Sequence, residues 1–170
     1  MLASQLFLAA QDNRLDVVTL LIAAGADVNK ARFDGCTPLG IAAVRDHAGV
    51  VSVLIETAGV DLNAALTDGK KAGATPLFVA AQKNRLDAVN LLIDAGADLD
   101  MARVNDGFTP LHKATRNSHS DVVDLLIAAG ANVNAATRTD GTTALTIALR
   151  LGLAEVVQRL RAAGANSGAD

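Results

Sequence analysis

The chain has 170 residues, of which 51% are hydrophobic, and it contains no Trp, no Tyr and four Phe. Its formal net charge is −3 with both signs interspersed, so nothing global attracts it to nucleic acid or to a membrane surface. The chain has no apolar run of the roughly 18 residues that a membrane span needs. Its start, "MLASQLFLAA", lacks the basic segment of a signal peptide, so we expect a cytoplasmic or nuclear protein.

Nearly the same ten residues occur three times along the chain. The copies are "LLIAAGADVN" at 20–29, "LLIDAGADLD" at 91–100 and "LLIAAGANVN" at 125–134. Gly59 and Gly164 align with the Gly of this phrase, and a Thr precedes four of the five glycines by 21 or 22 residues. Self-similarity at such a period is typical of repeat architectures. The sequence therefore predicts a single domain over 1–170. Its five units are approximately 1–31, 32–65, 66–102, 103–136 and 137–170.

Each unit has the pattern of two helices. The first helix is expected to follow a capping hydroxyl, with Pro next in three units, because that hydroxyl accepts from free amides of the first turn. The capping residues are Ser4, Thr37, Thr75, Thr109 and Thr143. After a polar turn, the second helix carries apolar residues at helical spacing, as in 17–22. A carboxylate lies in its first turn in four units, and a Gly suited to the left-handed conformation ends it.

The units are joined by loops that contain "FDG" at 33–35, "NDG" at 105–107 and "TDG" at 139–141. Such turns suit the tip of a β-hairpin. The loop at 64–74 is four residues longer than the loop after the first unit, and the unit before it has one extra residue in "ETAG". We therefore expect 56–74 to be the segment least protected against hydrogen exchange.

The segment "DGFTPLHKATRNSHSDVVDLLIAAGANVN" at 106–134 resembles an ankyrin repeat nearly throughout, and the other four units resemble it with fewer matches. The resemblance implies an all-α repeat solenoid, a right-handed stacked array of helix–turn–helix units with β-hairpin finger loops. One helix pair cannot bury its apolar face alone, so neighbouring units must stack to form a continuous core. The resemblance also implies a non-catalytic protein–protein interaction module.

The two end units are expected to act as caps, and the protein is expected to be a monomer. A terminal repeat has no outer neighbour and should be polar on that side. The last unit has Arg159 and Arg161 where the other units carry apolar residues, so we expect this helix to face water there.

Recurring polar residues favour structural roles over chemistry. The carboxylates and amides that follow each helix-ending Gly are expected to make turn hydrogen bonds. They are Asp27, Asp61, Asp98, Asn132 and Asn166. We interpret His47, His112 and His119 as structural, and Cys36, the only cysteine, as structural in preference to a reactive thiol. No spacing indicates a metal, cofactor or catalytic site, so we expect no enzyme and no cofactor.

The resemblance implies that partners bind to the finger tips and to the ends of the inner helices, on the concave side. The candidate binding residues there are Arg32, Phe33, Arg45, Lys71, Lys83, Phe108, Lys113, Arg116, Asn117, Arg138 and Arg150. Aromatic and Arg side chains are typical binding anchors, and we expect Phe33 and Phe108 to be exposed at finger tips. For Lys113, a long stem with a solvated head is an open alternative.

This basic stripe favours a protein partner with an acidic surface. Three alternatives stay open. The stripe is a merely solvated face, it binds nucleic acid or another polyanion, or the chain is a scaffold or regulatory inhibitor subunit. The negative net charge and the few aromatic residues argue against nucleic acid.

Overall fold

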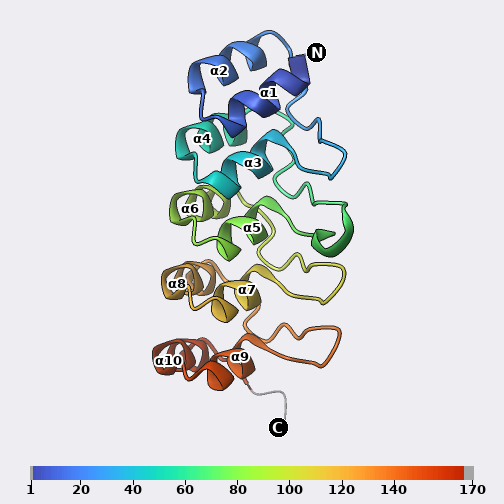
Figure 1. Cartoon of the computed structure of the whole chain (residues 1–170). Coiled ribbons are helices and arrows are strands. Elements are labelled where there is room, and N and C mark those ends of the chain that lie inside the picture. The colour runs from blue at the N-terminus through green and yellow to red at the C-terminus, as the bar shows by residue number, and fades with distance from the viewer. Residues whose placement is uncertain (1, 167–170) are drawn as a thin grey trace.

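The computed structural model describes residues 2–166, and its ten α-helices form five stacked pairs (Figure 1). The helices are α1 (Leu2–Gln11), α2 (Leu15–Ala23), α3 (Pro38–Arg45), α4 (Ala48–Glu56), α5 (Pro76–Gln82), α6 (Leu86–Asp94), α7 (Pro110–Arg116), α8 (Ser120–Ala128), α9 (Ala144–Leu151) and α10 (Ala154–Ala162), with one 3₁₀ turn, η1 (Gly69–Lys71). We number the repeats one to five by these pairs. The odd-numbered helices form an inner row beside the finger loops, and the even-numbered helices form an outer row (Figure 1). This architecture is the predicted all-α repeat solenoid.

The inner helices begin where the Thr residues predict. Thr37 Oγ1 accepts from the Gly40 N–H at 3.1 Å, and Thr75 Oγ1 accepts from the Phe78 N–H at 3.1 Å. The prediction for Ser4 is wrong, because α1 is already helical from Leu2. No proline follows Ser4 to hold the preceding backbone extended, and Leu and Ala at positions 2 and 3 are strong helix formers.

The outer helices also end as predicted. The Gly that follows each of them has a positive φ, from +81° at Gly25 to +90° at Gly130. The predicted first-turn carboxylates are present in α2, α6, α8 and α10, beside free amides that carry partial positive charge.

The core is one continuous cluster that runs through all five repeats. Each inner helix contributes one fully buried leucine, and the outer helices contribute buried Val and Leu. The inner-helix leucines are Leu6, Leu39, Leu77, Leu111 and Leu145, each at most 2% exposed. Buried alanines beside them, such as Ala42 and Ala43, allow neighbouring inner helices to pack closely. A single repeat therefore has no closed core, and its stability depends on its neighbours.

Asn and Asp side chains after the outer helices join successive repeats. Asn29 Oδ1 accepts from the Asp61 N–H at 2.8 Å, and its Nδ2 donates to the Gly59 carbonyl. The bond from a backbone N–H to Oδ1 recurs at the three following junctions, and the bond from Nδ2 to a Gly carbonyl recurs from Asn134 to Gly164. Asp27 also accepts from the Asn29 N–H, which is the predicted turn hydrogen bond. These residues thus stabilise the turn and fix the spacing between successive repeats.

The turn inside each repeat makes a second set of links. The His47 Nδ1 lies 3.0 Å from the Ala10 carbonyl, the Arg85 Nε donates to the Val44 carbonyl at 3.0 Å, and the His119 Nε2 lies 3.1 Å from the Gln82 carbonyl. All three acceptors belong to the end of the preceding inner helix, where carbonyls have no partner within the helix. The structural interpretation of both histidines is confirmed.

The finger loops form tight turns, and no strand is present within residues 2–166. A backbone hydrogen bond closes the finger base, as from Arg103 N–H to the Phe108 carbonyl at 2.9 Å. Lateral backbone bonds join neighbouring fingers, as from Arg138 N–H to the Asp106 carbonyl at 3.3 Å. The expected hairpin tips are therefore present as turns, and their pairing is too short for a regular ladder.

The two ends of the stack differ from the sequence expectation. Arg161 is exposed, but Arg159 is only partly exposed, and its Nη1 lies 3.1 Å from Asp124 Oδ2 on α8. Arg159 therefore packs along the preceding repeat as an ion-pair partner and does not simply face water. At the other end, Leu20 of α2 is 69% exposed, so the outer helix of repeat one is not polar on its surface.

Candidate functional site

The face that carries the fingers and the inner helices is the candidate site. Nine of the eleven candidate residues are exposed there, while Phe108 and Lys113 are half-buried. Candidate residues line several hollows on this face, and two of these hollows contain three candidates each. Arg32, Lys71 and Lys83 line the first, which we call the N-terminal groove, and Phe108, Arg116 and Arg150 line the second, the C-terminal groove. The other five candidates, Phe33, Arg45, Lys113, Asn117 and Arg138, line neither groove.

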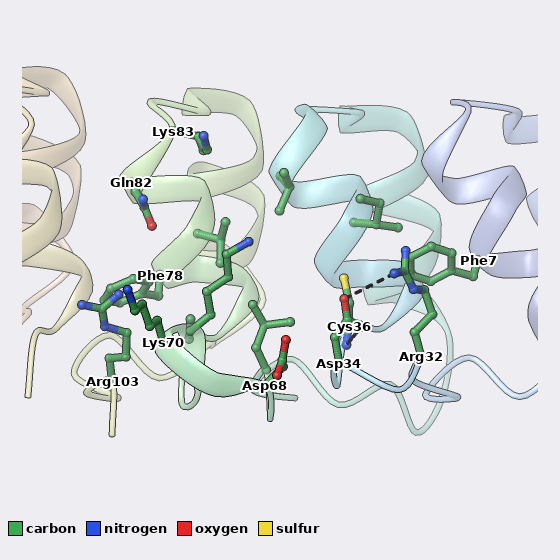
Figure 2. A pocket seen from close by; sticks show the side chains of 16 residues that line it. Phe7, Arg32, Asp34, Cys36, Asp68, Lys70, Phe78, Gln82, Lys83 and Arg103 are labelled. Atoms are coloured by element: carbon green, nitrogen blue, oxygen red, sulfur yellow. Dashed lines mark hydrogen bonds and ion pairs between the residues drawn. The ribbon is translucent and has the colours of Figure 1, made fainter. Parts of the chain in front are cut away.

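The N-terminal groove has a volume of about 450 Å³ and extends from repeat one to the finger of repeat four, which contributes Arg103. Figure 2 shows the Arg32–Phe7 pair at one end and the Arg103–Phe78 pair at the other, with Cys36 and Asp68 between them. Its apolar floor comes from neighbouring inner helices, because Ile41 and Val44 belong to α3 and Val79 to α5.

The N-terminal groove is electropositive in an acidic chain. Five cations and two carboxylates line it, which gives a net charge of +3 against −3 for the whole chain. The cations are Arg32, Lys70, Lys71, Lys83 and Arg103. Arg32 and Arg103 pair with carboxylates of their own fingers, whereas the three lysines form no ion pair within residues 2–166.

The C-terminal groove is smaller, at about 370 Å³, and extends over repeats four and five. Its single carboxylate, Asp140, is already used inside its finger, where it accepts from the Thr137 hydroxyl and from the Thr142 N–H. These hydrogen bonds lower the pKa of Asp140 to about 2, so it stays ionised.

All four Phe rings of the chain lie within 6 Å of a cationic group, at distances from 5.1 to 5.9 Å. The Arg32 guanidinium lies 5.2 Å from the Phe7 ring and 5.1 Å from the Phe33 ring, and Arg103 lies 5.7 Å from Phe78. A cation over the face of an aromatic ring is attracted by its quadrupole. The arginines are therefore held in place before any partner arrives.

Phe108 is not the exposed tip that the sequence predicts. Its ring packs at 5.5 Å against the His112 ring, with the Lys113 Nζ at 5.9 Å and the Arg116 guanidinium at 5.5 Å. Burial, together with the nearby Arg103 and Arg116, lowers the pKa of Lys113. The Lys113 ammonium group thus lies over the Phe108 ring and is partly buried. Phe33 is the exposed finger-tip aromatic, at 88%.

His112 is the structural residue that the resemblance implies. Its Nδ1 accepts from the Thr109 N–H at 3.2 Å, and its Nε2 lies 3.1 Å from the Thr142 carbonyl of the next finger. Burial lowers the pKa of His112, and a neutral ring suits this pattern because Nδ1 acts as an acceptor.

Two further polar groups also serve the scaffold. Burial, with the nearby Asp34 carboxylate, raises the pKa of Cys36 to about 11, which disfavours the nucleophilic thiolate. Asn117 donates from Nδ2 to the Gln82 carbonyl at 2.8 Å, so its amide already links two repeats. No cluster of potential metal ligands is present in residues 2–166.

Sequence reasoning missed Phe7, Phe78 and Arg103 as parts of the face. A signal was available, because Phe7 and Arg32 have the same separation along the chain as Phe78 and Arg103. Each aromatic ring belongs to an inner helix and lies beneath the arginine of the following finger. The floor of the groove left no such signal, since isolated Ile and Val residues are indistinguishable from core residues in sequence.

The fold is an α-helical repeat solenoid, and one of its faces does not contribute to the core. The family profile described as "Ankyrin repeats (3 copies)" matches residues 6–103 and 101–170. The chain belongs to the ankyrin repeat family, as its resemblance indicates. Ankyrin repeats are generally protein–protein interaction modules and generally not enzymes.

Curated relatives are similar over about half of the chain. The neurogenic locus Notch protein of Drosophila melanogaster is 38% identical over 96 residues, which is 56% of this chain and 3% of that protein. Alpha-latrocrustotoxin-Lt1a of Latrodectus tredecimguttatus is 36% identical over 92 residues, 54% of this chain and 6% of the toxin. Human neurogenic locus notch homolog protein 2 is 38% identical over 95 residues, 56% of this chain and 4% of that protein. The chain spans only a small part of these relatives.

The helices within residues 2–166 are too short and insufficiently apolar for any of them to cross a membrane.

Proposed function

We propose that the chain is a non-catalytic module that binds a protein partner on its concave face, through the fingers and the inner-helix ends. Membership of the ankyrin repeat family supports a protein as the partner. Because the stack is held together by repeated hydrogen bonds, the face loses little conformational entropy on binding.

The observation that supports this proposal most strongly is the solvent exposure of the Phe33 side chain. Its ring is 88% exposed at a finger tip, contributes nothing to the core, and lies 5.1 Å from the Arg32 guanidinium. Aromatic and Arg side chains dominate the energetics of protein interfaces when a partner removes them from water.

The charge of the face indicates the kind of partner surface. Arg45, Lys83 and Arg150 are exposed at inner-helix ends and form no ion pair within the described residues. An acidic partner surface would complement them and speed association at low salt. The alternative reading, a scaffold or regulatory inhibitor subunit, uses the same contacts.

The proposal is tested by affinity capture with two charge-matched variants. Lys83→Glu with Arg150→Glu changes the concave face, whereas Arg14→Glu with Arg161→Glu makes the same charge change in a turn and on an outer helix. We expect a set of captured proteins that the wild type and the control retain and the concave variant loses. Thermal melts monitored by circular dichroism check that both variants are folded.

Two outcomes would contradict the proposal. Equal capture by both variants would remove the concave face as the binding surface. Complete loss of the captured material after nuclease treatment would favour nucleic acid as the partner instead.

A further inference from the structure

The N-terminal groove has an apolar floor, and the scaffold does not require an apolar residue at one of its positions, Val44. Ile41, Val44 and Val79 are only half-buried, although they lie beside one another on α3 and α5. At the position of Val44, the other inner helices carry polar residues: Gln11, Gln82, Arg116 and Arg150. The fold therefore accepts a polar residue here, and the valine leaves apolar surface open to solvent.

Small residues occupy two positions near the groove that carry rings in other repeats. Ala74, at the base of the second finger, lines the groove and occupies the place of Phe108. Gly40 aligns with Phe7, Phe78 and His112 and lines a separate hollow of about 20 Å³ beside Cys36 and Val79. An alanine in place of a phenylalanine leaves room above α3, where the groove has a volume of about 450 Å³.

The rim of the groove attracts negative charge. Lys70 and Lys71 come from η1 in the longer second finger, and Lys83 follows α5. None of them has an ion-pair partner within residues 2–166, and together with the two arginines they outnumber the carboxylates Asp34 and Asp68. A concave site lined by one sign of charge concentrates ligands of the opposite sign.

We infer that the N-terminal groove binds an acidic peptide segment of the partner, which places one aliphatic or aromatic side chain on the floor of Ile41, Val44 and Val79. The lysines of the rim then pair with carboxylates on both sides of that anchor. This inference rests on the proposed function and specifies the part of the concave face that recognises the partner. A volume of about 450 Å³ lies within the range of pockets that hold small molecules or a few side chains.

The rings near the groove favour a peptide over single-stranded nucleic acid. Binding of single strands relies on aromatic faces on which bases stack. Phe7 and Phe78 are at most 4% exposed, and arginines lie over both rings. The groove therefore offers an apolar floor with cations but no free aromatic face.

The test begins with phage-displayed random peptides of twelve residues, panned against the full chain. We expect the enriched peptides to carry net negative charge and one apolar residue whose replacement by Ala weakens binding. Fluorescence anisotropy then gives the Kd of an enriched peptide for the wild type and for three variants.

Val44→Gln introduces the residue that repeats one and three have at this position, so the fold is expected to tolerate it. We expect it to raise the Kd about tenfold, as does replacing the peptide's apolar anchor by Ala. Lys70→Glu with Lys71→Glu should also raise the Kd and flatten its dependence on salt. Arg161→Glu, on the outer helix α10 and outside the candidate face, should leave the Kd within about twofold.

Each of the following results would contradict a specific part of the proposal. Enrichment of neutral or basic peptides, enrichment of none, or an unchanged Kd in Val44→Gln would overturn the inference. If acidic peptides bind and their Kd responds to Lys70→Glu with Lys71→Glu but not to Val44→Gln, the concave face remains the binding surface and only the assignment of the apolar floor fails. If capture of partners is indifferent to the concave face, the proposed function itself fails.

Discussion

Repeats two and four have the same helices and caps but opposite surfaces at the base of their fingers. In repeat four, two rings and two cations occupy this place, whereas in repeat two it stays open. The matched pairs are Phe108 and Cys36, His112 and Gly40, Lys113 and Ile41, and Arg116 and Val44. In repeat four these side chains pack on one another, with ring and cation distances of 5.5 to 5.9 Å.

The difference shows which positions the scaffold leaves free. Both repeats are capped by Thr and Pro, and both bury their inner leucine, at 0% for Leu39 and 1% for Leu111. The four positions therefore change what the face presents, rings and cations packed on one another in repeat four and small or aliphatic side chains in repeat two, without changing the buried leucine beneath. Specificity in such a protein is expected to lie where repeats differ.

The largest effect is expected when repeat four loses its ring. His112→Ala removes the partners of the buried Thr109 N–H and Thr142 carbonyl and leaves a cavity beside Phe108. We expect the free energy of unfolding to fall by about 2–4 kcal/mol, measured by urea denaturation. A loss below about 0.5 kcal/mol would mean that the hydrogen bonds of His112 add nothing to the stack.

A feature that both repeats share should respond equally in both. Gly35 and Gly107 have φ values of +82° and +74°, and a Cβ there would lie 2.6 and 2.7 Å from the backbone nitrogen of the next finger. Gly141 has a φ of +67°, but nothing lies within 4 Å of its Cβ position. The three Ala substitutions carry a similar backbone cost, because all three glycines have a positive φ. Urea denaturation of the three variants therefore isolates the effect of the contact with the next finger. We expect Gly35→Ala and Gly107→Ala to cost about 1–2 kcal/mol more than Gly141→Ala. Equal losses in all three variants would refute the lateral contact as the cause.

His112 of repeat four should also make stability depend on pH near neutrality. Repeat two has no titratable group at the matching position and should show no such dependence there. Burial holds the pKa of His112 below its unfolded value of about 6.5, so the unfolded chain binds the proton more tightly. Its contribution is present above about pH 6.5 and is lost as the pH falls towards the folded pKa, by at most about 1.4 kcal/mol per pH unit.

The measurement is the difference in unfolding free energy between the wild type and His112→Ala from pH 7.5 to 5.5. That difference should shrink as the pH falls, whereas a constant difference would show that His112 does not titrate differently on folding. The lowered pKa of Asp140, at about 2, affects stability only at lower pH.

The smallest effect is expected in repeat two and has the opposite sign. Gly40 lies inside α3, and a Cβ there would be 3.5 Å from its nearest neighbours, Cys36 Sγ and Thr37 Oγ1, which is ordinary contact. Gly40→Ala should therefore stabilise the protein by about 0.5–1 kcal/mol, visible as a higher midpoint of urea unfolding. A destabilised variant would indicate that repeat two needs the glycine for packing.

Sequence reasoning succeeded where one residue acts on its near neighbours. Thr75 caps the helix that begins beside it, and Gly25 adopts the left-handed conformation at a helix end. It failed for Ser4, because the prediction transferred the register of the other repeats to a segment that lacks the following proline. For the site, the exposure of Phe33 was predicted correctly, and that of Phe108 was not.

Composition, period and local caps thus determined the class of fold, the helix pairs and the turn roles of the recurring Asp and Asn residues, while the family resemblance implied the structural role of His112. Only the tertiary structure decided that Lys113 and Arg116 lie against Phe108, that Arg159 pairs with Asp124, and that α3 and α5 share an open floor. Caps and turns depend on bonds within a few residues, which a sequence pattern records. Side-chain contacts across a face depend on the spacing of stacked repeats and on which positions are empty, and that geometry exists only after the layers have packed.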